Sequence, residues 1–204
     1  MRKLGWAIVC GAMCVALPLH AQMRRPDGVG SIDPSGDHDP SENQVQLPPN
    51  PEGRAEDLRL AGKCDEAVPI LRRLAGSEPI AQYNLGQCLI DLGKGEANAQ
   101  RAHAFEQEGA GWILKAANEG LPKAQSSLVA VYLDGSGVDK DPVEAAKWAL
   151  LYQENGTRMV LGLPGIAKDL RARLDDTLTA QTMNDARERA ASWVPTSQRS
   201  NADN

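Results

Sequence analysis

The chain has 204 residues, with 27 acidic residues against 22 Lys and Arg, and a formal net charge of −5 at pH 7. No cluster of Lys and Arg interrupts this acidic character, which argues against a nucleic-acid-binding protein because phosphate backbones select clustered positive charge. The region predicted to fold holds a single histidine, His103, with no arguable Ser-His-Asp arrangement, so no catalytic residue, metal site or cofactor is predicted.

The N-terminus has the pattern of a secretory signal peptide. Arg2 and Lys3 precede an apolar run over residues 4–19, and the sequence turns polar after Ala21. A run of about 16 residues is shorter than the ~20 that span a bilayer, which favours a cleaved signal over the alternative of a membrane anchor. We therefore expect residues 1–21 to be removed, leaving an exported, periplasmic and soluble chain without a membrane span.

Residues 22–53 are rich in Pro, Gly, Ser, Asp and Asn and contain few aliphatic side chains. Such a segment cannot bury enough apolar surface to offset the entropy lost on ordering, so a disordered linker is predicted. Its acidic run from Asp33 to Glu42 lacks the ligand spacing of a calcium-binding EF-hand loop, which favours a solvated linker over a metal site. At the other end, residues 195–204 are predicted to form a disordered tail.

From residue 54 onward, apolar residues recur three and four positions apart, which is the pattern of amphipathic helices. Breaks at Gly and Pro divide this region into helix pairs at about 54–76, 79–120, 122–156 and 164–194. A short amphipathic pair can bury its apolar face only against a neighbouring pair. Residues 54–194 are therefore predicted to form an all-α solenoid, an α/α superhelix of about four antiparallel helix pairs.

The two central pairs are imperfect copies of each other. Ala81 matches Ala124 at an offset of 43 residues, whereas Trp112 matches Trp148 at an offset of 36. The difference indicates a seven-residue insertion ahead of Gly109, and its composition suits a longer second helix better than a loop. A residue as small as Gly109 would let neighbouring helices approach closely.

Two cysteines, Cys64 and Cys88, lie outside the predicted signal peptide. Cys64 opens the second helix of the first pair and Cys88 lies near the end of the next helix, so antiparallel packing brings these helix ends together. In an oxidising compartment we expect a disulfide rather than a metal site or a catalytic cysteine, with two buried free thiols as the alternative. A bridge that closes a loop of about 25 residues is expected to stabilise the fold by roughly 3 kcal/mol.

Several segments resemble Sel-one-like repeats (SLR), which are relatives of the tetratricopeptide repeats. The segments that carry the resemblance are Ala81–Gly86 (AQYNLG), Trp112–Gly120 (WILKAANEG), Ala124–Gln125, Gly135–Asp141 (GSGVDKD) and Ala145–Trp148 (AAKW). The match extends over about residues 79–156, and the first pair matches only in outline. Several residues at a shared spacing are a specific indicator of fold and a weak indicator of function.

The resemblance implies that the first helix of each pair lines the concave side of the superhelix. In the usual register, this partner-binding groove is lined by Tyr83, Gln87, Asp91, Lys123, Ser126 and Asp134. These side chains would hold an extended peptide by hydrogen bonds and charge, and an ordinary solvated helix face is the alternative. The expected function is a protein–protein interaction module or adaptor that binds a protein or peptide partner and has no enzymatic activity.

Two other functions stay open. A scaffold for cell-wall or exopolysaccharide assembly would differ mainly in its partner. Some cysteine-rich exported relatives bind or hydrolyse β-lactams, but two mature cysteines are fewer than one bridge per repeat, which argues against a hydrolase. Carboxylates such as Glu106 and Asp175 are ordinary on helix surfaces and predict no glycosidase pair.

Overall fold

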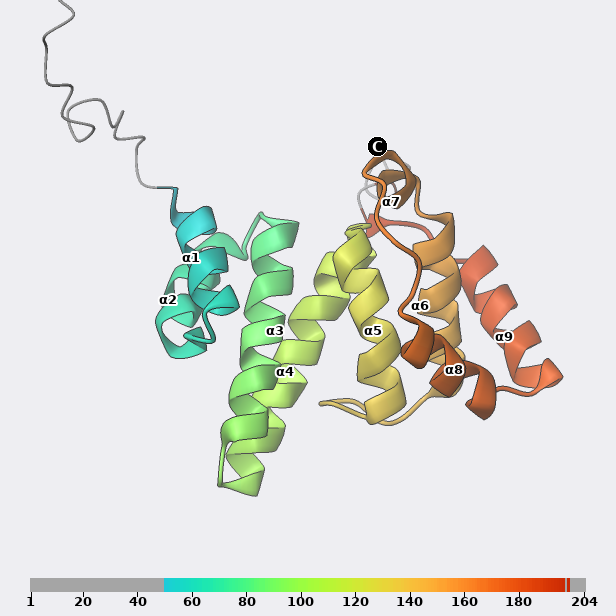
Figure 1. Ribbon diagram of the computed structural model, residues 1–204, viewed down its shortest axis with the longest axis horizontal. Coiled ribbons are helices and arrows are strands. Elements are labelled where there is room, and N and C mark those ends of the chain that lie inside the picture. Colours follow the sequence, from blue (N-terminus) through green and yellow to red (C-terminus); the bar gives the residue numbers. More distant parts are fainter. Residues whose placement is uncertain (1–49, 197, 199–204) are drawn as a thin grey trace, which may run out of the picture. The chain divides into compact units, whose positions relative to one another are not determined.

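The computed structural model describes residues 50–196 and 198. The predicted signal peptide and nearly all of the predicted linker lie outside these residues, so both stay predictions. The helices are α1 (Pro51–Leu60), α2 (Cys64–Leu74), α3 (Pro79–Gly95), α4 (Ala99–Asn118), α5 (Pro122–Asp134), α6 (Pro142–Glu154), α7 (Gly156–Val160), α8 (Lys168–Thr177) and α9 (Ala180–Ala191) (Figure 1). The described part of the chain contains no strand, which confirms the predicted all-α class.

Local signals fix where the helices begin. Proline in the first turn begins α1, α3, α5 and α6, because a missing N–H costs least there. Asn50 caps α1 by accepting the backbone N–H groups of Glu52 and Gly53, so the helix begins at Pro51 rather than at residue 54. Asp141 caps α6 in the same way.

The helices stack in chain order. α1 packs on α2, α3 on α4 and α5 on α6, while α2 also packs on α3 and α4 on α5. One apolar cluster joins the first three helices around Leu71 and Leu85, and a second joins α4, α5 and α6 around Ile113, Leu128 and Trp148. This continuous stacking is that of a helical solenoid, as predicted.

The last helices differ from a simple fourth pair. α9 packs mainly on α6, whereas α8 contacts α5 and α6. The short helix α7 was not predicted. Its cap is Asn155, which ends α6 and accepts the backbone N–H of Arg158 with its side chain, so the chain changes direction at this residue.

The insertion lengthens both helices of the second pair. α4 has 20 residues against 13 in α6, as the sequence predicted, and α3 has 17 against 13 in α5. The α3–α4 connection is short and occupies residues 96–98, whereas the α5–α6 connection occupies residues 135–141. Residues that form a loop in the third pair are therefore part of the helices in the second pair.

α3 and α4 touch through glycine. A Cβ added to Gly86 would lie 2.6 Å from the carbonyl oxygen of Gly109, and one added to Gly109 would lie 2.7 Å from the carbonyl oxygen of Gly86. Both distances are far below van der Waals contact, so neither position accepts a side chain without separating the helices. The close approach predicted at Gly109 is confirmed.

Gly109→Ala is expected to lower the free energy of unfolding by about 2 kcal/mol, because overpacking outweighs the better helix propensity of Ala. Gly111→Ala is the matched control in the same helix, since a Cβ there meets no atom within 4 Å. It should raise the stability by up to about 1 kcal/mol. Urea unfolding followed by circular dichroism compares the two, and a shift of the same sign in both variants would contradict the glycine contact.

An ion pair ties α2 to α4. Both terminal guanidinium nitrogens of Arg72 donate to the carboxylate of Glu108, and the Trp112 indole N–H donates to the same carboxylate at 3.2 Å. The hydrogen bonds from Arg72 chiefly hold the pKa of the Glu108 carboxyl below its ordinary value, and the pKa of Arg72 is raised in turn. This pair helps to fix the position of the first two helices on the longer α4.

Candidate functional site

Cys64 and Cys88 form a disulfide that joins the start of α2 to α3, with their Cα atoms 5.0 Å apart. Their exposed fractions are 4% and 0%, so the bridge lies within the core of the first three helices. The predicted pairing is confirmed. Both sulfur atoms are used by the bridge, and neither is a thiolate nucleophile or a metal ligand in this state.

The six residues predicted to bind a partner lie on α3 and α5, and we call the surface formed by α1, α3 and α5 the first-helix face. On α3, Tyr83 and Gln87 are half-buried, and the Tyr83 ring packs against the second apolar cluster. Within the described residues, neither the Tyr83 hydroxyl nor the Gln87 amide has a hydrogen-bond partner. Asp91 is exposed and pairs with Lys94 one turn further on, at 3.7 Å.

Two of the three α5 residues of this face, Lys123 and Asp134, pair with residues of other helices. The Lys123 ammonium lies 4.0 Å from the Glu56 carboxylate, so side chains of α1 and α5 meet although α3 lies between these helices in the chain. The Ser126 hydroxyl donates to the Lys123 carbonyl at 2.9 Å. Asp134 accepts a hydrogen bond from Arg173 of α8. Within the described residues, Tyr83 and Gln87 on α3 thus have no side-chain hydrogen-bond partner, whereas Lys123 and Asp134 on α5 pair with residues of other helices.

A cavity of about 330 Å³ lies between α5 and the segment that leads into α8. Of the six predicted residues, only Ser126 lines it. The other lining residues are Ser127, Ala130, Tyr152, Pro164, Gly165, Ile166, Ala167 and Leu170. The Tyr152 hydroxyl donates to the Pro164 carbonyl at 2.6 Å and so fixes the chain at the cavity wall.

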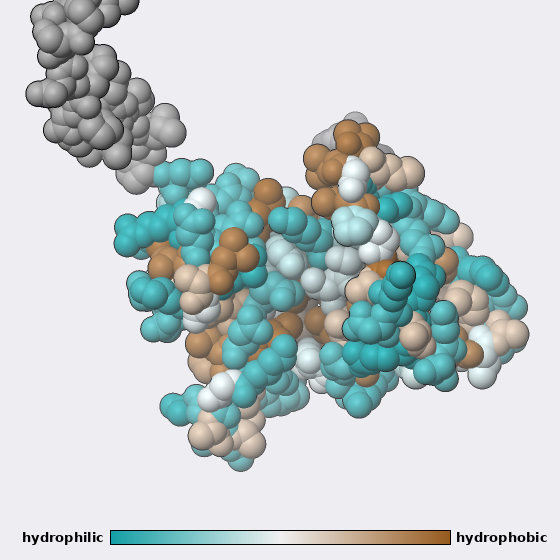
Figure 2. Space-filling view, in the orientation of Figure 1, coloured by the Kyte–Doolittle hydropathy of each residue, from teal (hydrophilic) through white to brown (hydrophobic). Residues whose placement is uncertain are grey.

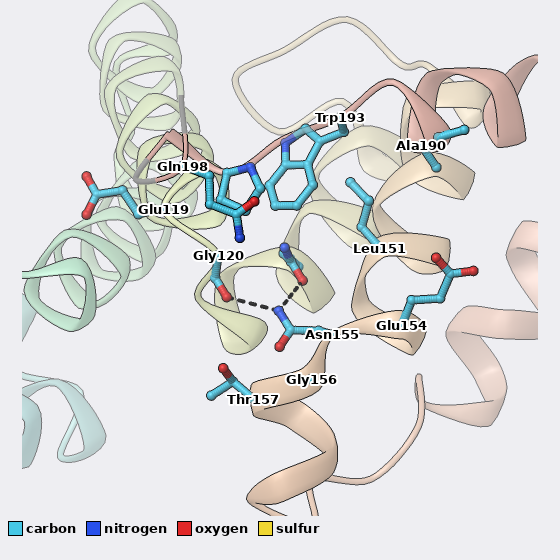
Figure 3. A pocket seen from close by; sticks show the side chains of 13 residues that line it. Glu119, Gly120, Leu151, Glu154, Asn155, Gly156, Thr157, Ala190, Trp193 and Gln198 are labelled. Atoms are coloured by element: carbon cyan, nitrogen blue, oxygen red, sulfur yellow. Dashed lines mark hydrogen bonds between the residues drawn. The ribbon is translucent and has the colours of Figure 1, made fainter. Parts of the chain in front are cut away.

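A larger cleft, of about 570 Å³, lies where the ends of α4, α6 and α9 meet (Figure 3). At its floor the Asn155 amide donates to the Gly120 carbonyl and to the Gln125 side chain, both at 2.9 Å. The Asn155 oxygen accepts the Arg158 backbone N–H, and the Gln125 amide donates to the Ala117 carbonyl at 3.5 Å. The side-chain amides of Asn155 and Gln125 are therefore already hydrogen-bonded within the fold.

The remaining side chains of this cleft also serve the packing. Trp193 lies beside the amides in Figure 3, its indole N–H donates to Asn118 at 3.2 Å, and its ring meets Trp148 edge-on with centroids 6.0 Å apart. The carboxylates of Glu119 and Glu154 point away from the floor in the same view. Size alone therefore does not make this cleft the better binding site.

The amide contacts recur from pair to pair. Gln82 occupies in α3 the position of Gln125 in α5, and its amide donates to Glu119 at the end of α4, as Gln125 contacts Asn155 at the end of α6. Both glutamines are buried. The two glutamines follow Ala81 and Ala124, which match each other in the alignment of the two repeats. Their hydrogen-bond partners depend on where the second helix of each pair ends, so no sequence pattern predicts them.

Charged residues hold α9 on α6. Arg189 donates to Glu144 at 2.8 Å and to Asp141 at 3.4 Å, and these contacts raise the pKa of the arginine. Nearby, burial is the main cause that raises the pKa of the Tyr132 hydroxyl, with the Glu144 and Asp141 carboxylates adding to it. Lys147 also pairs with Glu144, so two cations face the two carboxylates of this network.

The surface over α7 is apolar. Met159, Val160 and Leu161 have exposed fractions of 59%, 88% and 64%, and Figure 2 shows this hydrophobic patch at the top of the view. Arg158 fixes the backbone below it by donating to the Leu163 and Gln153 carbonyls. Three consecutive apolar residues are the sequence signal that indicates this patch.

His103 is exposed on α4. Among residues 50–196 and 198, no three His, Cys, Asp or Glu side chains are grouped so that they could hold a metal ion. None of the helices in this part of the chain combines the length and the apolarity that crossing a bilayer requires.

Helix pairs stacked in chain order define a helical repeat protein, a class that uses extended surfaces to bind other proteins. The structure is similar to the crystal structure of c5321, a protective antigen present in uropathogenic Escherichia coli strains that displays an SLR fold, with a TM-score of 0.55 and 28% sequence identity. This likeness confirms the resemblance to the Sel-one-like repeats.

The match covers 70% of this chain and 29% of c5321, so this chain spans less than a third of that protein. No model of a known protein family matches the sequence, and no curated protein matches it.

Proposed function

We propose that this chain is an exported adaptor that binds a protein partner on its first-helix face. One observation carries the proposal. Tyr83 and Gln87, one turn apart on α3, present a hydroxyl and an amide that have no hydrogen-bond partner among the described residues. The amides of the larger cleft, by contrast, are bonded within the fold.

The chemistry of the free groups suits a peptide backbone. A glutamine amide both donates and accepts, and a tyrosine hydroxyl does the same, so the two can bond successive N–H and C=O groups of an extended segment. Both side chains are half-buried, which limits the rotamer entropy lost when a partner binds. Asp91 and Lys94 add charges of both signs beside them.

The disulfide supports export. Disulfides form and persist in oxidising compartments and are rare in the cytosol, where thiols are kept reduced. The bridge between Cys64 and Cys88 lies in the core of the first three helices and is therefore part of the fold. We place the adaptor in the periplasm on this basis and on the signal-like pattern of residues 1–21.

Site-specific photocross-linking in intact cells tests the proposal. A photoreactive amino acid at position 87 is expected to capture a discrete periplasmic protein, identified by mass spectrometry. The same group at His103, which is exposed on α4, is the control and should capture nothing above background. The same set of proteins at both positions, or none at position 87, would count against the first-helix face.

Tyr83→Phe refines this test. It removes the hydroxyl and keeps the ring that packs against the core, so capture at position 87 should fall about fivefold, as expected for one lost hydrogen bond of about 1 kcal/mol, without a change in Tm. Tyr132→Phe is the matched control, because that ring also packs against the core but lies outside the predicted set. Charge reversal at Asp134 is less suitable, since it would also repel or release Arg173 of α8.

A further inference from the structure

α8 lies on the part of the first-helix face that α5 contributes. Arg173 of α8 forms an ion pair with Asp134, and the segment leading into α8 closes the cavity lined by Ser126. Of the six residues predicted to bind a partner, Asp134 is therefore paired with α8 although its side chain stays exposed, and Ser126 lines the cavity beside the segment that leads into α8. On α3, the equivalent positions are Tyr83 and Asp91, and neither contacts a residue of another helix through a hydrogen bond or an ion pair within the described residues.

Few contacts hold α8 in this place. Of its ten residues only Leu174 is buried, and the N-terminus has no side-chain cap. The loop before it contains Gly162, with a φ of +63°, followed by Pro164 and Gly165. α9, the helix that follows α8, packs mainly on α6 and therefore does not hold α8 in place. Helices with few buried apolar contacts belong to the part of a protein that opens at low cost.

The side chains of α8 that contact the other helices form a simple pattern. Leu170 and Leu174, four residues apart, pack against the second apolar cluster, and Arg173 supplies a positive charge to Asp134. Release of α8 would leave an apolar surface next to a carboxylate that has lost its cation. That surface is complementary to another helix with two aliphatic residues at positions i and i+4 and a basic residue at i+3.

We infer that α8 is an internal ligand, and that the partner displaces it with an amphipathic helix of the same pattern, which presents two aliphatic residues and one basic residue. The inference rests on the proposed function, because it concerns the partner of the same face. It adds that the free chain is partly self-inhibited, so a partner binds in proportion to the fraction of molecules in which α8 is released.

The test uses the full chain and a fluorescent synthetic peptide of residues 165–178, which has the α8 sequence. Arg173→Glu places like charges opposite each other at Asp134 and should release α8, so the variant is expected to bind the peptide at least tenfold more tightly than the wild type. Arg171→Glu is the control with the same charge change in the same helix, because Arg171 has no side-chain partner among the described residues. It should bind as the wild type does.

Hydrogen exchange followed by mass spectrometry provides a second measurement that does not depend on the peptide. The α8 amides should exchange faster than those of α6 in the wild type, and Arg173→Glu should accelerate α8 selectively. Exchange of α8 as slow as that of α6, or equal behaviour of Arg173→Glu and Arg171→Glu, would overturn the inference.

The two proposals fail in different ways. Absence of any captured protein at position 87, in the wild type and in Arg173→Glu, would remove the adaptor function and with it the claim about the partner. Capture in the wild type that Arg173→Glu does not increase, relative to Arg171→Glu, would remove only the role of α8. An increase in capture of tenfold or more supports both.

Discussion

Gly137→Ala is expected to lower the free energy of unfolding by about 3 kcal/mol or more. Gly137 lies in the α5–α6 connection with a φ of +73°, where an L-residue with a Cβ is strained by roughly 1–2 kcal/mol. A Cβ would also lie 2.1 Å from the carbonyl oxygen of Glu106 in α4. The α4 atoms that this Cβ would meet all belong to backbone, so relief requires the loop to leave α4, and overpacking of this kind costs a further ~1–3 kcal/mol.

Gly162→Ala separates the two causes. Gly162 also has a positive φ, of +63°, but a Cβ there would meet no atom within 4 Å. This control should therefore lose only the conformational part, about 1 kcal/mol. Thermal and urea unfolding of the two variants measure the difference. Equal losses would mean that the α5–α6 connection does not rest on α4 in solution.

Gly137 also shows what the sequence could and could not predict. Two glycines so close together, Gly135 and Gly137, favour a break between two helices, and the α5–α6 connection lies there. That the turn rests on Glu106 followed from no sequence pattern, because the contact depends on the extra length of α4 produced by the insertion. Local breaks predict the ends of helices, whereas contacts between repeats depend on the lengths of all of them.

The same distinction applies to the candidate site. The resemblance assigned Tyr83 and Gln87 to the first helix of a pair, and both residues lie on α3, whereas their role in binding stays a prediction. It placed Ser126 and Asp134 equally well on α5, but it could not show that α8 lies against them. The position of α8 depends on the turn at Asn155, which has no repeat signature.

Removal of the disulfide is expected to have a comparably large effect, about 3 kcal/mol, because the open chain gains conformational entropy in the unfolded state. The double variant Cys64→Ala/Cys88→Ala, compared with the wild type in urea, measures the loss. Reductant should destabilise the wild type to a similar extent and leave the double variant unchanged. A wild type that is insensitive to reductant after denaturation would contradict the bridge.

Removal of the disulfide should destabilise the first helix pair more than the rest of the protein. α1 has one buried residue, Ala55, so the first pair is held to the array chiefly by α2 and by its bridge to α3. In the double variant, amides of α1 and α2 should exchange faster under native conditions, while those of α5 and α6 stay protected, because contacts in a solenoid reach only neighbouring pairs. Faster exchange throughout α5 and α6 would instead show that the array unfolds as one cooperative unit.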